Sequence, residues 1–585
     1  MITNRLQKIT LAEESFSFGK QLDLAKAHLR PASIVMSSEG LQAIKASSLS
    51  FGATLVEHMT NERWQICLTH RDVNASGAGM IIYEVKIGER IFSVRVGSTG
   101  LDKKEKDGRL RDLLFDFHCA IHVGTPSVYT LQQELEDQIS KVWQGRAKSS
   151  ALGWSFFNRS NRLYDDVIDK LVAQEPLHPF FLVGGGGYLV RNAGFYGNGR
   201  HGSISWESLE PGHPFSRPYH LDLFVLYMQR IAGFDFLELT AQQRNSAATK
   251  IPTHLKRYLG IGNASGAGMI GILAKNPQWL NAIIYPRELA IAFLRTQSLM
   301  TTEAIVRFRK LLIRGACYYT EVDAHIKPRT QVGEELQNVL LILNKHYEYI
   351  YSNWSNFLDE VTCLMCRDTL EQVHSLLINT YPKLVAALRP VVESSMKDKP
   401  AFKPEMPVFD LQILVEQSYG WALKTHRVAP EKNWYFWYRS EENGENRRGE
   451  RAIDPGVEIE TFVDLIGAAQ TLYEKLKHAP RNQSTARFLL DFPEQAFFVE
   501  RLQFLANKPY ADYNINVTSL DFKPSQIICA YLTAFGLEIA NPNSVNWVRG
   551  TLLQGAPLPE DIAAGRQIDW SMPSIPDGNE LGSGY

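Results

Sequence analysis

Residues 80–96 read MIIYEVKIGERIFSVRV, and this stretch decides how the N-terminal part of the chain folds. Apolar and polar residues alternate on both sides of Gly88-Glu89, a pair suited to a tight turn. The pattern predicts a β-hairpin, with one strand from Met80 to Ile87 and the next from Arg90 to Val96. The earlier run from Trp64 to Thr69 has the same character, so we expect an antiparallel β element near the N-terminus.

The octapeptide NASGAGMI occurs twice, at residues 74–81 and again at residues 263–270. Its glycines allow the backbone to turn tightly and to approach a ligand closely. The first copy precedes the hairpin and is predicted to be a turn that leads into a strand. At the second copy we expect Gly260 and Gly262 to end one helix and Asn263 or Ser265 to cap the next, which would leave backbone N–H groups for an anion. The alternative is close packing of two helices through small side chains.

After Val128 the spacing of apolar residues changes to three and four, which predicts helices. The stretches with this spacing are 130–143, 161–172, 219–231, 279–294, 303–312, 333–343, 347–391, 458–477 and 494–505, and another helix is expected to open at Pro524. The aromatic residues of 347–357 have helical spacing, which favours a packing face over a platform for nucleobases. The predicted fold class is α+β, mainly α-helical, with an antiparallel β element near the N-terminus.

The length of 585 residues suggests two to four domains, and changes in composition divide the chain into five segments. We expect an N-terminal α+β region with β-hairpins (1–127), a mainly helical middle (128–396), a Pro-rich linker or loop (397–407), a C-terminal mixed α/β segment (408–570) and a flexible tail (571–585).

Composition excludes some classes of function. The chain has 62 basic and 63 acidic residues and a net charge of −1, so no overall field draws it to nucleic acid or to an anionic membrane. The first residues, Met1 to Lys20, lack the apolar run of a signal peptide, and no stretch approaches the roughly 20 apolar residues that span a bilayer. Six cysteines do not make a disulfide framework, which favours a cytoplasmic protein.

Two spacings are compatible with metal or redox chemistry, and neither is complete. Cys363 and Cys366 form a single CxxC without the second pair of a zinc site. His118 and His122 would meet one metal if they lay on a helix, but the Glu of an HExxH motif is absent. We therefore predict no metal ligands, and the cofactor and the oligomeric state stay open.

The first candidate site is the glycine-rich run of residues 184–202, in which eight of nineteen residues are glycine. Such a density indicates a loop that moves or a backbone that a ligand approaches closely. Arg200 and His201 lie on this run. A guanidinium presents a planar fork to carboxylate or phosphate, and an imidazole exchanges protons near neutral pH. The alternative is a surface loop with ordinary turns.

The second candidate is residues 434–451, which read WYFWYRSEENGENRRGER. Five aromatic residues lead into a run of charges, a pattern that can place acids, bases and anion-binding groups at the mouth of a pocket. We expect Arg439 and Arg448 to bind an anionic substrate, and Glu441 or Glu442 to act as a general base if burial raises the pKa of its carboxyl. The alternative is a solvated turn whose exposed ion pairs contribute little.

Ala264-Ser265-Gly266 matches the tripeptide from which histidine and phenylalanine ammonia-lyases build their electrophilic prosthetic group, and Ala75-Ser76-Gly77 matches it again. The resemblance to that family stops at these residues. Ala267-Gly268 replaces the Asp-Leu that follows in the family, and the family's Gln-Asp-x-Tyr-Ser motif has no counterpart.

Four phrases spread over most of the chain resemble an uncharacterised family of large, soluble proteobacterial proteins. They are GNGRHG (197–202), LGIGNASG (259–266), WYRSEE (437–442) and QGAPLP (554–559). The resemblance implies a bacterial protein in which these segments belong to one architecture, and it implies no activity.

The predicted function is that of a soluble enzyme that acts on a small anionic metabolite in a pocket lined by these loops. Its substrate-binding residues would be Arg200, Asn263, Ser265, Arg439 and Arg448, and its catalytic residues His201, Glu441 and Glu442. One alternative is a non-catalytic binding or scaffold protein with a helical partner surface. A more remote alternative is an enzyme of the ammonia-lyase type that uses Ala264-Ser265-Gly266. The reaction class is not predicted.

Overall fold

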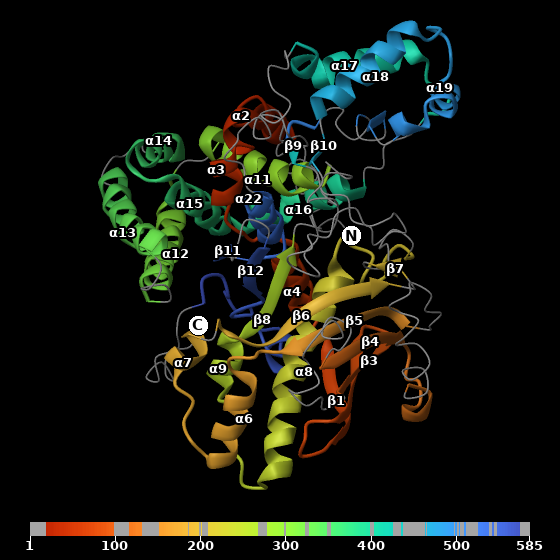
Figure 1. The fold of residues 1–585 in the computed structure, drawn as a ribbon. Coiled ribbons are helices and arrows are strands. Elements are labelled where there is room, and N and C mark those ends of the chain that lie inside the picture. Colours follow the sequence, from red (N-terminus) through yellow and green to blue (C-terminus); the bar gives the residue numbers. More distant parts are fainter. Residues whose placement is uncertain are drawn as a thin grey trace, which may run out of the picture.

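A large β-sheet packed with helices forms the centre of the protein, and a second group of helices lies beyond it (Figure 1). The computed structural model describes residues 19–98, 116–131, 151–184, 186–197, 200–201, 209–266, 278–297, 300–321, 327–347, 353–397, 403–424, 435–436, 462–463, 465–496, 498–499, 502, 508–510, 524–537, 541–542 and 547–573.

The sheet has ten strands, which come from both halves of the chain. Their order is β1 (Gln65–Val73), β2 (Gly79–Ile87), β3 (Arg90–Ser98), β4 (Phe117–Val123), β5 (Ala151–Arg159), β6 (Tyr188–Gly197), β8 (Gly260–Gly266), β12 (Trp547–Leu552) and β11 (Asn541–Pro542), with β7 (Arg200–His201) paired to β6. Neighbours are antiparallel except β6 and β8, which are parallel. The mixed α+β class is confirmed, but the expected antiparallel element is part of a larger, mixed sheet.

The hairpin predicted from residues 80–96 is present as β2 and β3, with Ile87 opposite Arg90. Gly88 has a φ of 57°, which only glycine adopts readily. The first octapeptide is the predicted turn. The Asn74 side chain accepts hydrogen bonds from the backbone N–H groups of Ser76 and Ala78, both at 3.0 Å, and β2 follows directly.

The second octapeptide does not cap a helix, contrary to expectation. Its described residues belong to β8, which lies between β6 and β12. Asn263 is opposite Gly550, and Ser265 is opposite Val548. A strand on each side supplies hydrogen-bond partners for the backbone. The same residues that form a turn in the first copy therefore have an extended backbone in the second.

The glycine-rich run is also largely a strand rather than a loop, because residues 188–197 form β6. β6 and β5 lie under the long helix α8 (His220–Arg244), which crosses one face of the sheet (Figure 1). Buried polar groups fix this contact. The Asn192 amide donates to Gln229 Oε1 at 2.9 Å, and Gln229 donates to Ser155 Oγ at 2.7 Å.

Arg230 of α8 holds three distant segments together. Its fully buried guanidinium donates to the backbone carbonyls of Leu259 at 2.6 Å, Lys256 at 2.9 Å and Ala556 at 3.0 Å. Burial lowers the pKa of Arg230 to about 10, which leaves it charged at neutral pH. The start of β8 and the turn after β12 therefore meet at one side chain.

The remaining helices cover the sheet or form the group beyond it (Figure 1). They are α2 (Ala32–Val35), α3 (Ser38–Ala43), α4 (Phe51–Asn61), α6 (Tyr164–Ala173), α7 (Pro179–Gly184), α9 (Thr253–Tyr258), α11 (Gln278–Gln297), α12 (Thr302–Glu321), α13 (Lys327–Tyr347), α14 (Trp354–Leu364), α15 (Arg367–Thr380), α16 (Pro382–Lys397), α22 (Pro524–Ala534) and α23 (Pro559–Ala563). Trp354 and Phe357 are fully buried, which confirms for these two residues the predicted packing face.

A separate group of elements comes from the segment after residue 403. It contains α17 (Val408–Leu423), α18 (Leu465–His478), α19 (Thr485–Asp491), a 3₁₀ turn (Pro493–Gln495), and the two-residue strands β9 (Tyr435–Phe436) and β10 (Phe462–Val463). Within the described residues, no helix is both long enough and apolar enough to cross a bilayer. The five-segment division of the chain stays a prediction.

Candidate functional site

The residues singled out from the sequence lie in two places or outside the described structure. Arg200 and His201 form β7 at the end of β6, and Asn263 and Ser265 lie in β8. β6 and β8 are paired only near their starts, after which β6 follows β5 and β8 follows β12. The structure does not describe the side chains of Arg200, His201 and Ser265. Four further candidates lie wholly outside the described residues: Arg439, Glu441, Glu442 and Arg448. The convergence of these groups on one pocket stays a prediction.

The two weak metal candidates lie on different elements of the fold. His118 and His122 lie on β4 and are buried, and the His118 ring covers Gly97 so closely that a Cβ there would collide with it. Burial and the nearby Arg95 hold the pKa of His118 well below its usual range. Cys363 lies in the last turn of α14, and Cys366 precedes α15. Among the residues that the structure places, no three metal-ligating side chains come together.

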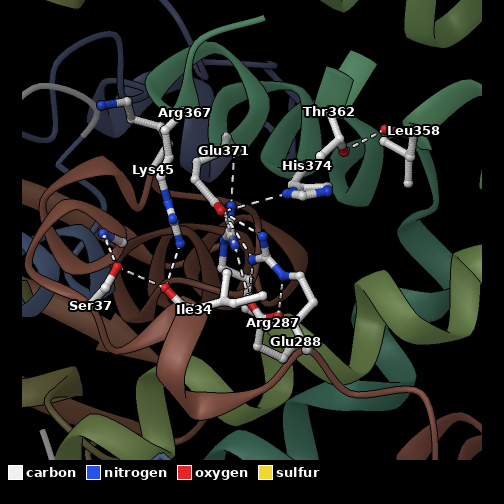
Figure 2. Close-up of polar contacts among 12 residues, drawn as sticks. Ile34, Ser37, Lys45, Arg287, Glu288, Leu358, Thr362, Arg367, Glu371 and His374 are labelled. Atoms are coloured by element: carbon white, nitrogen blue, oxygen red, sulfur yellow. Dashed lines mark hydrogen bonds and ion pairs between the residues drawn. The ribbon is translucent and has the colours of Figure 1, made fainter. Parts of the chain in front are cut away.

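The densest buried cluster of charge comes from residues that the sequence reading did not select (Figure 2). Arg30 precedes α2, Arg287 and Glu288 are adjacent on α11, and Glu371 and His374 lie one turn apart on α15. We call these five residues the ion cluster. All but Arg30 are nearly or fully buried, so their charges must be satisfied by one another.

The geometry of the ion cluster meets this requirement. Arg30 donates two hydrogen bonds to the carboxylate of Glu288, from Nε and from Nη2, both at 2.7 Å. Its Nη1 donates to Glu371 Oε1 at 2.6 Å. Arg287 Nη1 lies 2.7 Å from Glu371 Oε2, and its Nη2 donates to the Glu371 backbone carbonyl at 2.8 Å. Bidentate pairs of this kind are the strong form of the ion pair. Two guanidiniums and two carboxylates therefore balance, and the N-terminal segment is fastened to α11 and α15.

The protonation states follow from burial and from the neighbouring charges. Burial alone would raise the pKa of Glu371, but Arg30 and Arg287 outweigh it and hold the pKa well below its usual range. Burial, together with Arg30, lowers the pKa of His374 to about 4. At neutral pH His374 is therefore uncharged, and its Nδ1 lies 3.4 Å from Glu371 Oε2. The cluster carries no net charge, which keeps the desolvation cost of a buried site low.

A small pocket of about 30 Å³ adjoins the ion cluster, and Arg287 lines both. The other walls are residues 44–51, α11, Val392 of α16, and the end of α22 at Thr533 and Ala534. The volume has room for about two water molecules, or for the head group of a small anion.

Two cations border this pocket. Lys45 is one of the lining residues, and its Nζ lies 2.6 Å from Asp368 at the start of α15. The backbone carbonyl of Lys45 accepts a hydrogen bond from Ser375 Oγ at 2.9 Å, which fixes the loop against α15. Arg287 is the other, and its buried Nε–H is without a hydrogen-bond partner in the described part of the chain. This N–H is one of several buried side-chain groups that lack a partner among the described residues, and a hydrogen-bond acceptor beside it would be favoured.

The N-terminus of α4 reaches the same pocket. Ser50 is the N-cap, with Oγ accepting from Ala53 N at 3.2 Å, and Ser50 and Phe51 both line the cavity. The first N–H groups of a helix lack partners within the helix, and its dipole places partial positive charge there. Gly52 lets α4 begin against α22, because a Cβ at this position would collide with the Phe535 carbonyl oxygen. Lys45, Arg287 and this helix end thus all border one cavity, and the charges of the two cations are balanced by Asp368 and by Glu288 and Glu371.

No protein-family model matches the chain, and neither a curated protein nor a solved structure matches it. The resemblances stated from the sequence therefore stay predictions.

Proposed function

We propose that the protein recognises a small anionic metabolite through the pocket of Lys45, Arg287 and the α4 N-terminus, and that it acts on this metabolite as an enzyme. The observation that supports recognition is the meeting of two cations and a helix N-terminus at one cavity beside a balanced ion cluster. An anion there would accept a hydrogen bond from the Arg287 Nε–H, for which the described residues supply no acceptor.

The volume of the pocket constrains how a metabolite would bind. At about 30 Å³ it admits a carboxylate or phosphate head group and not a whole metabolite, so the body of the ligand would remain outside. The predicted acid–base groups, His201, Glu441 and Glu442, stay candidates for the chemical step. The reaction class is left open by this proposal.

The two alternatives gain less support. An exposed aromatic patch at residues 347–357 would favour a scaffold role with a helical partner surface, and Trp354 and Phe357 are buried. The ammonia-lyase reading depended on Ala264-Ser265-Gly266, which lies extended in β8 and paired with β12. An intact mass of the purified chain that is lower by two water molecules would favour the ammonia-lyase alternative instead.

The test is a calorimetric titration of the full chain with sulfate as the probe, at pH 7.5 and low ionic strength, in the wild type and in Lys45→Gln. Loss of one cation from a partly desolvated anion site should weaken sulfate binding about tenfold, since charged hydrogen bonds contribute roughly 1.5–3 kcal/mol. The control is Lys26→Gln, which removes a similarly paired lysine from an exposed position that does not line the pocket.

The control variant should bind sulfate as the wild type does. If the wild type fails to bind sulfate, or if both variants bind it as tightly as the wild type, the pocket is not an anion site and the proposal is wrong. A panel of phosphorylated and carboxylated metabolites, followed by product analysis, then separates an enzyme from a binding protein.

A further inference from the structure

Two histidines meet at the far end of α4 from the pocket. His58 lies in the last turns of α4, and His220 is the first residue of α8. Their ring centroids are 5.8 Å apart, and the edge of Trp64 packs against His58. His220 is 1% exposed, and its Nδ1 is without a hydrogen-bond partner among the described residues.

The charged groups that face this pair come from α4, from the segment before α8 and from α16. Two of these groups are guanidiniums. Arg217 precedes α8, and Arg389 is on α16. Two of the carboxylates are engaged by guanidiniums, Glu57 of α4 by Arg389 and Glu393 of α16 by Arg217 at 3.6 Å, and Glu62 faces His58 itself at 3.4 Å. A proton on His58 would therefore meet Glu62 as well as the two guanidiniums. A proton on His220 would face Arg217 and His58.

Burial is the main cause that lowers the pKa of both rings, and the guanidiniums add to it. For His58, Arg217 and Arg389 lower the pKa further, and Glu62 opposes them. For His220, the neighbouring His58 and Arg217 add to burial, and the Pro214 carbonyl opposes them. Both rings are therefore neutral in the folded state at neutral pH, and acidification strains the junction of α4, α8 and α16.

The same elements form the pocket. The N-terminus of α4 and Val392 of α16 line it, and the Glu57–Arg389 pair joins α4 to α16 between the two sites. We infer that protonation of the His58–His220 pair loosens α4 from α16 and so weakens anion binding at the pocket. The inference rests on the proposed function, since it concerns regulation of the same cavity. Linkage requires the converse as well: a bound anion must make the histidines harder to protonate.

Sulfate is a suitable probe because it keeps its double negative charge at both pH values of the experiment. Binding to the full chain is measured at pH 7.5 and pH 5.5 in the wild type, in His58→Gln, and in His178→Gln as the control at an exposed histidine. The wild type and the control should lose affinity about twofold or more on acidification, since the pKa of both rings lies below its usual value and pH 5.5 protonates them only in part. His58→Gln should lose much less. His374 titrates below this range and does not contribute.

Equal sulfate affinity at both pH values in the wild type, or an unchanged pH dependence in His58→Gln, would overturn the inference and leave the proposed function intact. Absence of sulfate binding at pH 7.5 would instead refute the proposed function. If His58→Gln does not fold, NMR titration of the wild-type histidines tests the inference instead. The His58 pKa should be lower with saturating sulfate than without it.

Discussion

At the scale of single residues, the ion cluster shows how a buried charge is made tolerable. Arg30, Arg287, Glu288 and Glu371 cancel in charge and exchange hydrogen bonds, so none stands alone in the interior. His374 completes the site by staying neutral. Among the described residues, the Arg287 Nε–H and the His374 Nε2 of the cluster are without a hydrogen-bond partner, and Arg287 also lines the pocket.

His374→Gln should change how stability depends on pH. The folded pKa of about 4 lies below the unfolded value of about 6.5, so the neutral ring contributes stability above pH 6.5 that is lost as the pH falls toward 4. The full difference corresponds to about 3 kcal/mol. The stability gap between the wild type and His374→Gln in urea unfolding should therefore narrow between pH 6.5 and 4. A gap that stays constant over this range would contradict the assigned protonation state.

The sequence could not identify this cluster, for a physical reason. Its residues lie far apart in the chain, and a lone Arg or Glu on a helix is usually solvated. Only the packing of α11 against α15 and the N-terminal segment brings them together. One local signal was available: Ser50 followed by Phe51, Gly52 and Ala53 has the form of a helix N-cap, and α4 begins there.

At the scale of elements, local patterns predicted what depends on local interactions. Alternation predicted β2 and β3, and three-to-four spacing predicted α8 and α11. β4 was missed because six of its seven residues are buried, so the chain shows no alternation there. β8 was misread because its extended backbone depends on β6 and β12, which come from distant parts of the sequence. The repeated octapeptide therefore has two conformations with two sets of neighbours.

Gly52→Ala should separate α4 from α22. The added Cβ would collide with the Phe535 carbonyl oxygen, and backbone gives way less easily than a side chain. Overpacking of this kind destabilises by about 1–3 kcal/mol, which exceeds the helix propensity that alanine gains. We expect a lower free energy of unfolding and weaker sulfate binding.

Gly420→Ala is the matched control, since it lies in α17 with nothing within 4 Å of an added Cβ. It should leave both stability and sulfate binding close to the wild type. Equal stability of the two variants would show that α4 and α22 are not packed as described.

At the scale of the whole molecule, one sheet joins strands from the N-terminal hairpins, the middle of the chain and the segment after residue 541 (Figure 1). Arg230 fastens two of these regions, and the ion cluster fastens the N-terminal segment to the helices. The pocket lies where three such regions meet: the loop before α4, the pair α11 and α16, and the end of α22. A site assembled in this way cannot be read from any single motif.

The most direct measurement is anomalous diffraction from crystals of the full chain soaked in selenate, a heavier analogue of sulfate. The account predicts an anomalous peak between Lys45, Arg287 and the N-terminus of α4, and its loss in crystals of Lys45→Gln. Selenate bound elsewhere on the molecule, with this pocket empty, would contradict it.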